Sequence, residues 1–231
     1  MFQSLKRFHL SNRSRGQSFL ELALVLPVLL ILLLGVTEVA FYIGSYMDVV
    51  DLTREAARFA SVRDPSAVNS DYNCSAGDDL NFFYDTACVI SPPAGTPGCI
   101  GTFCNGFNPY ITLNPATDDV VISVFTIAGG AVSDSTVFSL SHIFGYTDNY
   151  KKNCQGDTVR SAPYYSNAHI NSLLLSDAPA NKGYVAVEVY YCYDQVFGIP
   201  LITDFIPNPL QIHAYTLMPL PAAQPTPTPI P

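Results

Sequence analysis

The six cysteines are the residues of this chain whose type points most directly to a chemistry. Their number is even, and all of them follow a long apolar stretch near the N-terminus. Cysteines confined to one side of a membrane anchor favour disulfide bonds formed in an oxidising compartment. Zinc is the weaker interpretation, because no CxxC pair occurs. The sequence leaves the pairing open, and the disulfide candidates are Cys74, Cys88, Cys99, Cys104, Cys154 and Cys192.

Two carboxylates stand out because their surroundings are apolar. Glu21 lies five residues after Gly16, and Glu38 is the one charged residue between Leu22 and Gly44. A carboxylate at the centre of a bilayer costs roughly 2.5–3.5 kcal/mol on insertion scales, so it usually finds a partner. Glu38 is nearer the outer end of the run, so both a snorkelling interfacial acid and an acid partnered in an assembly remain open.

Catalytic patterns are absent from the sequence. The four histidines are scattered and form no H-x-x-x-H pair, and there is no G-x-S-x-G, P-loop or G-x-G-x-x-G motif. We therefore expect neither an enzyme nor a cofactor nor a metal site. The charge balance argues against nucleic acid as a partner as well. The formal net charge is −8, which provides no basic footprint for phosphates.

The elements that position these residues begin with the apolar run itself. Residues 22–44 would span roughly 34 Å as a helix, enough to cross a bilayer core of about 30 Å. Four basic residues and no acid precede Gly16, which favours a cytoplasmic N-terminus. Arg54, Arg58 and Arg63 flank the other end and weaken that preference, but the cysteines favour the outside for the rest of the chain. The sequence predicts a single-pass protein of the cell membrane with an extracytoplasmic C-terminal domain.

The helical pattern continues past the apolar run. Opposite charges recur three residues apart, as in Asp51–Arg54, and Asp64-Pro65 is a plausible stop. We expect one helix from about Ser18 to Val62. Its small-residue section around Ala56 is either a stalk or a packing spine in a filament or complex.

The remainder of the chain predicts an α+β domain with a disulfide-stapled antiparallel β-sheet and a short helix, packed on the outer part of the long helix. The segment from Pro65 to about Pro115 is rich in Gly, Pro, Asn and Cys and is expected to be mostly loops. The expected domains are a basic leader over 1–16, a transmembrane and stalk helix over 17–64, the α+β domain over 65–218, and a Pro-rich, extended tail over 219–231. The expected elements are a hairpin of Asp119–Ala128 and Ala131–Leu140, a helix over Asn167–Leu175 capped by Ser166, and strands over Gly183–Asp194 and Leu210–Met218.

A family resemblance is carried by three stretches of the N-terminal fifth of the chain. These are GQSFLELALVLP over 16–27, GVTE over 35–38 and REAARFA over 54–60. Together they resemble the TadE family of pseudopilins from the tight-adherence (Tad, Flp-type) pilus system. Leu22 takes the place of the aromatic residue that Flp-type prepilins favour directly after the glutamate.

The resemblance implies a membrane-anchored minor pilin-like protein that takes part in assembly of a thin surface pilus, and so in adhesion. It implies cleavage by prepilin peptidase between Gly16 and Gln17, and a role in assembly for Glu21, which would offset the new amine of a neighbouring subunit. The implied partners are membrane lipid, other pilin-like subunits, the Tad secretion machinery and prepilin peptidase. The alternative is a single-pass surface binding or adhesion protein unrelated to pili, and replacing residues 17–60 by an unrelated anchor would distinguish the two.

Overall fold

The computed structural model describes residues 14–65, 81–90, 113–114, 116–132, 138–141, 148–175, 182–198, 203 and 206–220. The chain divides into two compact units, residues 1–41 and residues 42–231, which we call the N-terminal unit and the C-terminal unit. Each unit is described by itself. Cys74, Cys99 and Cys104 lie outside the described residues, as do the leader before Ser14 and the tail from 221 onward.

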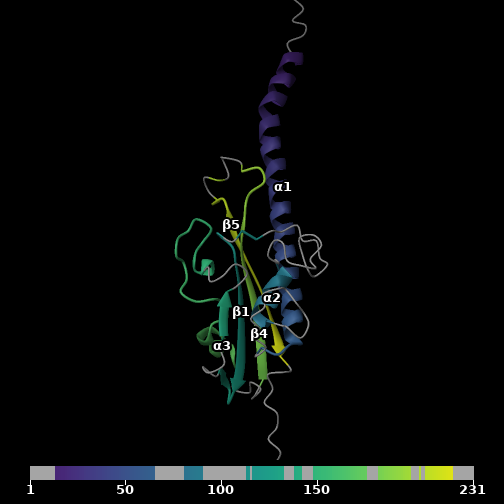
Figure 1. Cartoon of the computed structure of the whole chain (residues 1–231). Coiled ribbons are helices and arrows are strands. Elements are labelled where there is room, and N and C mark those ends of the chain that lie inside the picture. The colour runs from purple at the N-terminus through teal and green to yellow at the C-terminus, as the bar shows by residue number, and fades with distance from the viewer. Residues whose placement is uncertain are drawn as a thin grey trace, which may run out of the picture. The chain divides into compact units, whose positions relative to one another are not determined.

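Helix α1 runs from Ser14 to Ser61 and contains Pro27 (Figure 1). Its final turn is closed by the Arg63 amide, which donates to the Ala60 carbonyl over 3.0 Å. Pro65 follows, and the residue before a proline is disfavoured in helical conformation. The long helix is thus confirmed, with its start four residues earlier than expected.

The C-terminal unit is built on one antiparallel sheet. The strands pair in the order β2-β1-β4-β5, and β3 pairs with β1 as well. The long register between β4 and β5 runs from Gly183 opposite Leu220 to Tyr193 opposite Leu210. The bounds are β1 Asp119–Ala128, β2 Ala131–Val132, β3 Phe138–Ser141, β4 Lys182–Tyr193 and β5 Leu210–Leu220.

The expected hairpin forms, but its returning arm is split. Gly129 and Gly130 both have positive φ, 62° and 83°, which an Asn/Gly-type two-residue turn requires. Val132 pairs with Ile127, whereas Phe138 pairs with Val124, so the register shifts between β2 and β3. The prediction of one continuous strand over Ala131–Leu140 is therefore wrong, because turn and strand propensities do not report such a shift.

Residues 42–61 of α1 cover one face of the sheet. The alternating valines of β4, such as Val185 and Val187, face this side as predicted, and they join one core cluster with Val49 and Leu52 of the helix. Three alanines make the close approach possible, since each is fully buried: Ala56, Ala57 and Ala60. The small-residue section of α1 is therefore used within the chain's own core.

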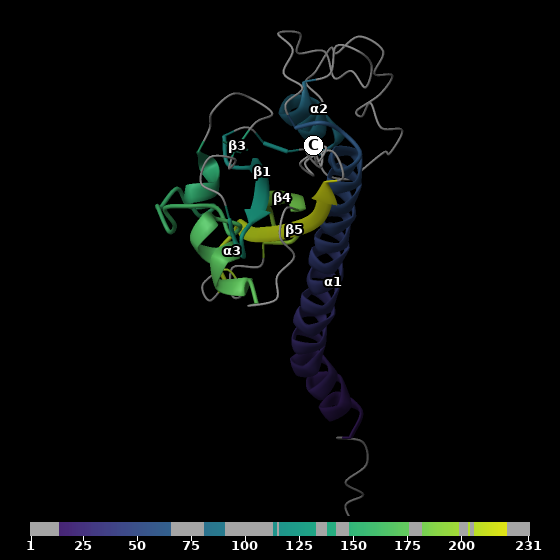
Figure 2. The same ribbon diagram turned by 90° about the horizontal axis from the view of Figure 1, so that it is seen from below.

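The opposite face is covered by helix α3, Asn167–Leu173 (Figure 2). The predicted cap is present, since the Ser166 hydroxyl accepts a hydrogen bond from the His169 amide. Ile170 is buried against Phe125 and Ala186 of the sheet. The sheet is thus sandwiched between helices, and both of its faces carry buried residues.

Helix α2, Phe82–Ile90, was not predicted, and the expectation of mostly loops is wrong for this segment. Every residue of α2 is buried. Asn81 and Asp85 cap it reciprocally: the Asn81 side chain accepts from the Tyr84 amide, and Asp85 accepts from the Asn81 amide over 2.7 Å. Tertiary burial on the core stabilises a helix whose aromatic and β-branched composition does not predict one.

Candidate functional site

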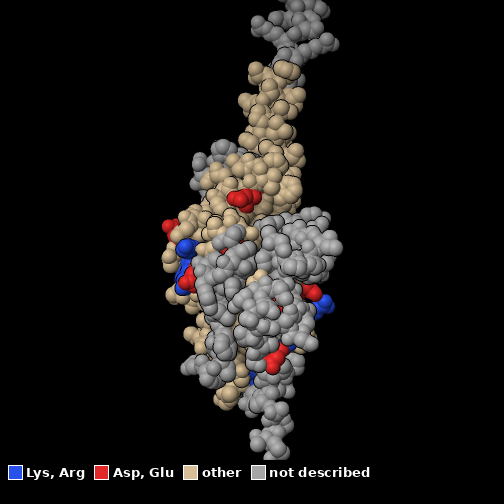
Figure 3. Space-filling model, in the orientation of Figure 1, with Lys and Arg blue, Asp and Glu red and all other residues tan. Residues whose placement is uncertain are grey.

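The N-terminal part of α1 is an exposed apolar surface. Large apolar side chains follow one another around the helix and are mostly exposed, from Phe19 at 73% to Phe41 at 49%. In the view of Figure 3 this part of α1 is tan. The helix is long and apolar enough to cross a membrane. An apolar surface of this extent is stable in lipid or against other helices and unfavourable in water.

The residues of the predicted processing site lie at the start of this surface. Gly16 and Gln17 are in the first turn of α1, and Glu21 follows Gln17 by about one turn with an exposed side chain. A carboxylate at this spacing from a new N-terminus is close enough to lower the free energy of a neighbouring ammonium group in a medium of low dielectric. Glu38 lies on the same helix and is half-buried.

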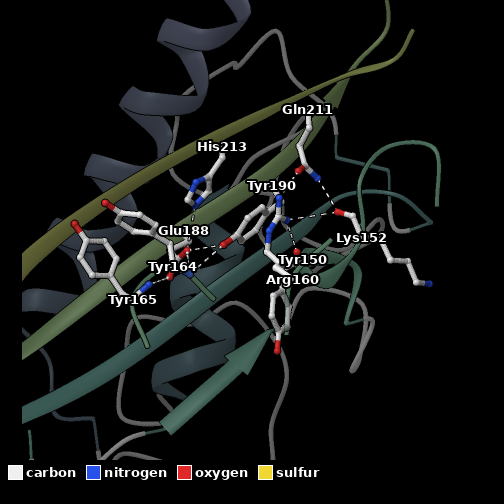
Figure 4. Close-up of polar contacts among 9 residues, drawn as sticks. All are labelled: Tyr150, Lys152, Arg160, Tyr164, Tyr165, Glu188, Tyr190, Gln211 and His213. Carbon is white, nitrogen blue, oxygen red and sulfur yellow. Dashed lines mark hydrogen bonds and ion pairs between the residues drawn. The ribbon is translucent and has the colours of Figure 1, made fainter. Parts of the chain in front are cut away.

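A second constellation lies in the C-terminal unit, on the face of the sheet that α3 covers. Its centre is Glu188 of β4, which is fully buried. The carboxylate accepts hydrogen bonds from the backbone amides of Tyr164 and Tyr165, at 3.0 and 2.9 Å. The Tyr190 hydroxyl donates to it over 2.7 Å, and His213 Nε2 lies 3.1 Å away (Figure 4). Four polar groups therefore converge on one carboxylate.

The aromatic rings around Glu188 extend this cluster across two strands. His213 of β5 is opposite Tyr190 of β4 in the register, and their rings stack with centroids 4.3 Å apart. Arg160 lies over the ring of Tyr190, with its guanidinium carbon 4.7 Å from the ring centroid. Arg160 also donates to the Tyr150 carbonyl and, over 2.7 Å, to Gln211 of β5 (Figure 4). Residues 150–165 are thereby held against β4 and β5 by the contacts of Arg160 and by the Tyr164 and Tyr165 amides.

The electrostatics of the cluster keep its phenols protonated. Burial, together with the neighbouring Glu188, raises the pKa of Tyr190 far above its usual range. Burial also raises the pKa of Tyr165 to about 12, with the nearby tyrosines adding to the effect. The raised pKa keeps both hydroxyls protonated even at a pH where an exposed tyrosine would ionise, and Tyr190 donates a hydrogen bond to the carboxylate.

A third group of contacts surrounds the disulfide between Cys154 and Cys192, whose Cα atoms are 5.6 Å apart. Asp118, next to β1, is buried and accepts from the Cys192 amide over 2.9 Å and from the Asn114 amide over 2.7 Å. Its pKa is raised by burial, and these hydrogen bonds oppose the rise. Cys88 is disulfide-bonded too. The predicted disulfide stapling is confirmed for the cysteines that the structure describes.

The polar clusters of the C-terminal unit join separate segments of the fold by hydrogen bonds. Glu188 is surrounded by donors from its own chain and has no exposed surface that a substrate would reach. No group of three or more His, Cys, Asp or Glu residues is placed to hold a metal ion in the described part of the chain. Glu188 was missed in the sequence, although a lone acid within the alternating run VAVEVYY was a signal that could have identified it.

The comparisons with known proteins give one match. The model of a family described as TadE-like protein matches residues 16–58. No curated protein and no solved structure matches the chain. The matched segment covers both the exposed apolar part of α1 and most of the part that packs on the sheet. The resemblance to the TadE-like family stated from the sequence is confirmed on residues 16–58 of α1.

Proposed function

We propose that this chain is a membrane-anchored, pilin-like subunit that takes part in assembly of a tight-adherence pilus. Its N-terminal apolar helix lies in the membrane and packs against other helices, while the C-terminal unit folds outside the cytoplasm. The observation that carries the proposal is the location of the family match. It falls on a helix whose first part exposes apolar side chains and whose second part is built into a folded domain.

The orientation is supported by charge and by cysteine chemistry. The described residues place Cys154 and Cys192 in a disulfide within the C-terminal unit. Such bonds persist in oxidising compartments and are rare in the cytosol. The basic leader before Gly16 favours the cytoplasmic side for the N-terminus.

Processing at the leader is the chemical event that this proposal requires. Cleavage between Gly16 and Gln17 would leave an ammonium group at the membrane edge, with Glu21 of the same or a neighbouring helix to offset its charge. Intact-mass measurement of the membrane-extracted protein, with and without prepilin peptidase, tests this step. We expect an N-terminus at Gln17 only when the peptidase is present. An unchanged leader under both conditions would remove cleavage from the proposal.

An anchor replacement tests the assembly role, and the structure fixes where the replacement must end. Exchanging residues 17–60 would remove Val49, Leu52 and Ala57 from the core of the C-terminal unit. Exchanging residues 17–41 for an unrelated membrane helix leaves that core in place. We expect the shorter exchange to keep the protein folded in the membrane but to abolish pilus assembly in cells that lack the natural chain.

The alternative is a surface-binding protein whose activity resides in the C-terminal unit. It is favoured by one observation: Tyr164 and Tyr215 are both exposed by more than 40%, and their rings stack with centroids 4.9 Å apart. Exposed stacked aromatic rings suit ligand or partner contact. Under this alternative, the exchange of residues 17–41 leaves adhesion intact, which is the opposite of the outcome expected for a pilus subunit.

A further inference from the structure

The C-terminal unit contains an apolar pocket that the proposed function does not use. Its cavity volume is about 240 Å³, and it lies between α3 and the face of the sheet that α3 covers. β1, β4 and β5 all contribute side chains to its floor, and Leu173 of α3 forms part of its wall. Tyr165 lines the pocket as well, and its backbone amide donates to the carboxylate of Glu188. None of the described residues that line the pocket is charged.

The pocket lies at the end of the sheet where β5 finishes. Leu217 of β5 lines it, three residues before the end of the strand at Leu220. Tyr184 of β4 also lines it, and Tyr184 is the register partner of Pro219. The chain therefore leaves the sheet directly beside two of the pocket residues.

We propose that this pocket binds the Pro-rich segment 221–231 of the same chain. The segment reads PAAQPTPTPIP, which contains no charged residue, matching the uncharged lining of the pocket. Prolines favour the polyproline II conformation, and such segments dock in grooves lined by aromatic side chains. Tyr165, Tyr184 and Phe125 supply those rings. Ile230, the largest non-proline apolar side chain of the segment, is the natural anchor.

Chain length permits the contact. Ile230 lies ten positions after Leu220, and an extended polyproline II segment advances roughly 3 Å per residue, or about 30 Å in all. Helix α3, which forms one wall of the pocket, is only about 11 Å long. A segment that can extend about 30 Å is therefore long enough to fold back from the end of β5 along this wall. The ordering cost is reduced because proline fixes φ before binding.

Tryptophan fluorescence tests the proposal, since the natural chain has no tryptophan. The full chain carrying Ile230→Trp is measured in detergent micelles, next to a free peptide of residues 221–231 with the same substitution. We expect the emission of the full chain to be shifted to shorter wavelength than that of the peptide, and its quenching by acrylamide to be weaker. Emission and quenching equal to those of the peptide would overturn the proposal.

A matched pair of second substitutions distinguishes the pocket from the micelle. Leu173 lines the pocket and is 58% exposed, whereas Leu175 is 72% exposed and does not line it, so neither substitution should unfold the domain. We expect Leu173→Glu to shift the emission to that of the free peptide and Leu175→Glu to leave it unchanged. A short-wavelength emission that survives Leu173→Glu would place the tryptophan elsewhere and would refute the proposal.

Dilution with the natural chain separates binding within one molecule from binding between two. The chain that carries both Ile230→Trp and Leu173→Glu lacks its own pocket, and an excess of the tryptophan-free chain leaves its emission equal to that of the free peptide if each segment occupies only the pocket of its own chain. A shift of that emission to shorter wavelength would instead mean that segments bind the pockets of other copies, which would overturn the assignment to the same chain.

Discussion

The two units of this chain treat polar and apolar side chains in opposite ways. Between Phe19 and Phe41, large apolar residues are mostly exposed along α1. In the C-terminal unit, a carboxylate is fully buried at Glu188, and its four contacts all come from the same unit. The first pattern is favourable only where the helix meets lipid or other apolar surfaces. The second is favourable only where every buried polar group is satisfied internally.

This difference separates assembly from folding. The C-terminal unit contains its own core, its own hydrogen-bonded carboxylate and its own disulfide, so its stability should be independent of what surrounds the N-terminal unit. The N-terminal unit exposes large apolar residues, and the proposed function places their partners in the membrane and the pilus assembly. Substitutions within residues 42–231 should therefore affect the stability of the C-terminal unit. Substitutions within residues 1–41 should instead affect assembly.

The largest effect is expected for Glu188→Ala. The substitution removes the acceptor of two backbone amides and of the Tyr190 hydroxyl, and loss of a buried, hydrogen-bonded charge costs about 3–5 kcal/mol. Urea denaturation, followed by the circular dichroism of the sheet, measures the free energy of unfolding of the C-terminal unit. Glu21→Ala is the control in the other unit, and we expect it to leave this free energy unchanged while impairing assembly.

Equal losses of stability in both variants would contradict the division into units. An unchanged stability for Glu188→Ala would mean that the carboxylate does not hold Tyr164 and Tyr165 to the sheet.

Removal of the disulfide should have the next largest effect. The Cys154–Cys192 bond closes a loop with a sequence separation of 38, and a loop of this size contributes about 2–4 kcal/mol by restricting the unfolded chain. The double substitution to serine should therefore lower the urea midpoint of the C-terminal unit. Reduction of the natural protein would also affect the bond of Cys88, so the double variant is the cleaner comparison.

The small-residue section of α1 provides a test within a single helix. Ala57 is fully buried against the sheet, so Ala57→Leu overpacks the core and should cost about 1–3 kcal/mol. Ala40 is exposed and belongs to the N-terminal unit. Ala40→Leu should leave the unfolding of the C-terminal unit unaltered. If both substitutions lower the free energy of unfolding of the C-terminal unit equally, α1 does not pass from an exposed helix to a core helix between Ala40 and Ala57.

The smallest effect is expected for the surface ion pairs of α1. Arg54 and Asp51 are 3.1 Å apart, but both side chains are more than 60% exposed. Arg54→Ala should change the free energy of unfolding by less than about 1 kcal/mol, since solvent screens exposed pairs. A larger loss, persisting at high salt, would mean that Arg54 contributes by some means other than its charge.

Local signals in the sequence were sufficient for the elements that are regular and long. The bounds of β1 agree with the prediction at both ends, and β4 differs by one residue at each end. The Ser166 cap marked the start of α3, and the apolar run marked α1. These signals work because periodicity and capping act within a few neighbouring residues.

The features that escaped prediction depend on contacts between distant parts of the chain. Helix α2 is formed by nine buried residues in a segment whose neighbours have loop-like composition. Glu188 accepts hydrogen bonds from the amides of Tyr164 and Tyr165, more than twenty positions away, and Cys154 pairs with Cys192 of β4 at a sequence separation of 38. Neither composition nor spacing encodes which residues will meet, so these contacts required the tertiary structure.

The most direct test of the account is peptide mapping of the non-reduced protein after membrane fractionation of cells that express it. We expect the chain in the membrane fraction, with the peptides of Cys154 and Cys192 recovered joined by their disulfide. Recovery of the full-length chain from the cytosol with both thiols free would contradict it.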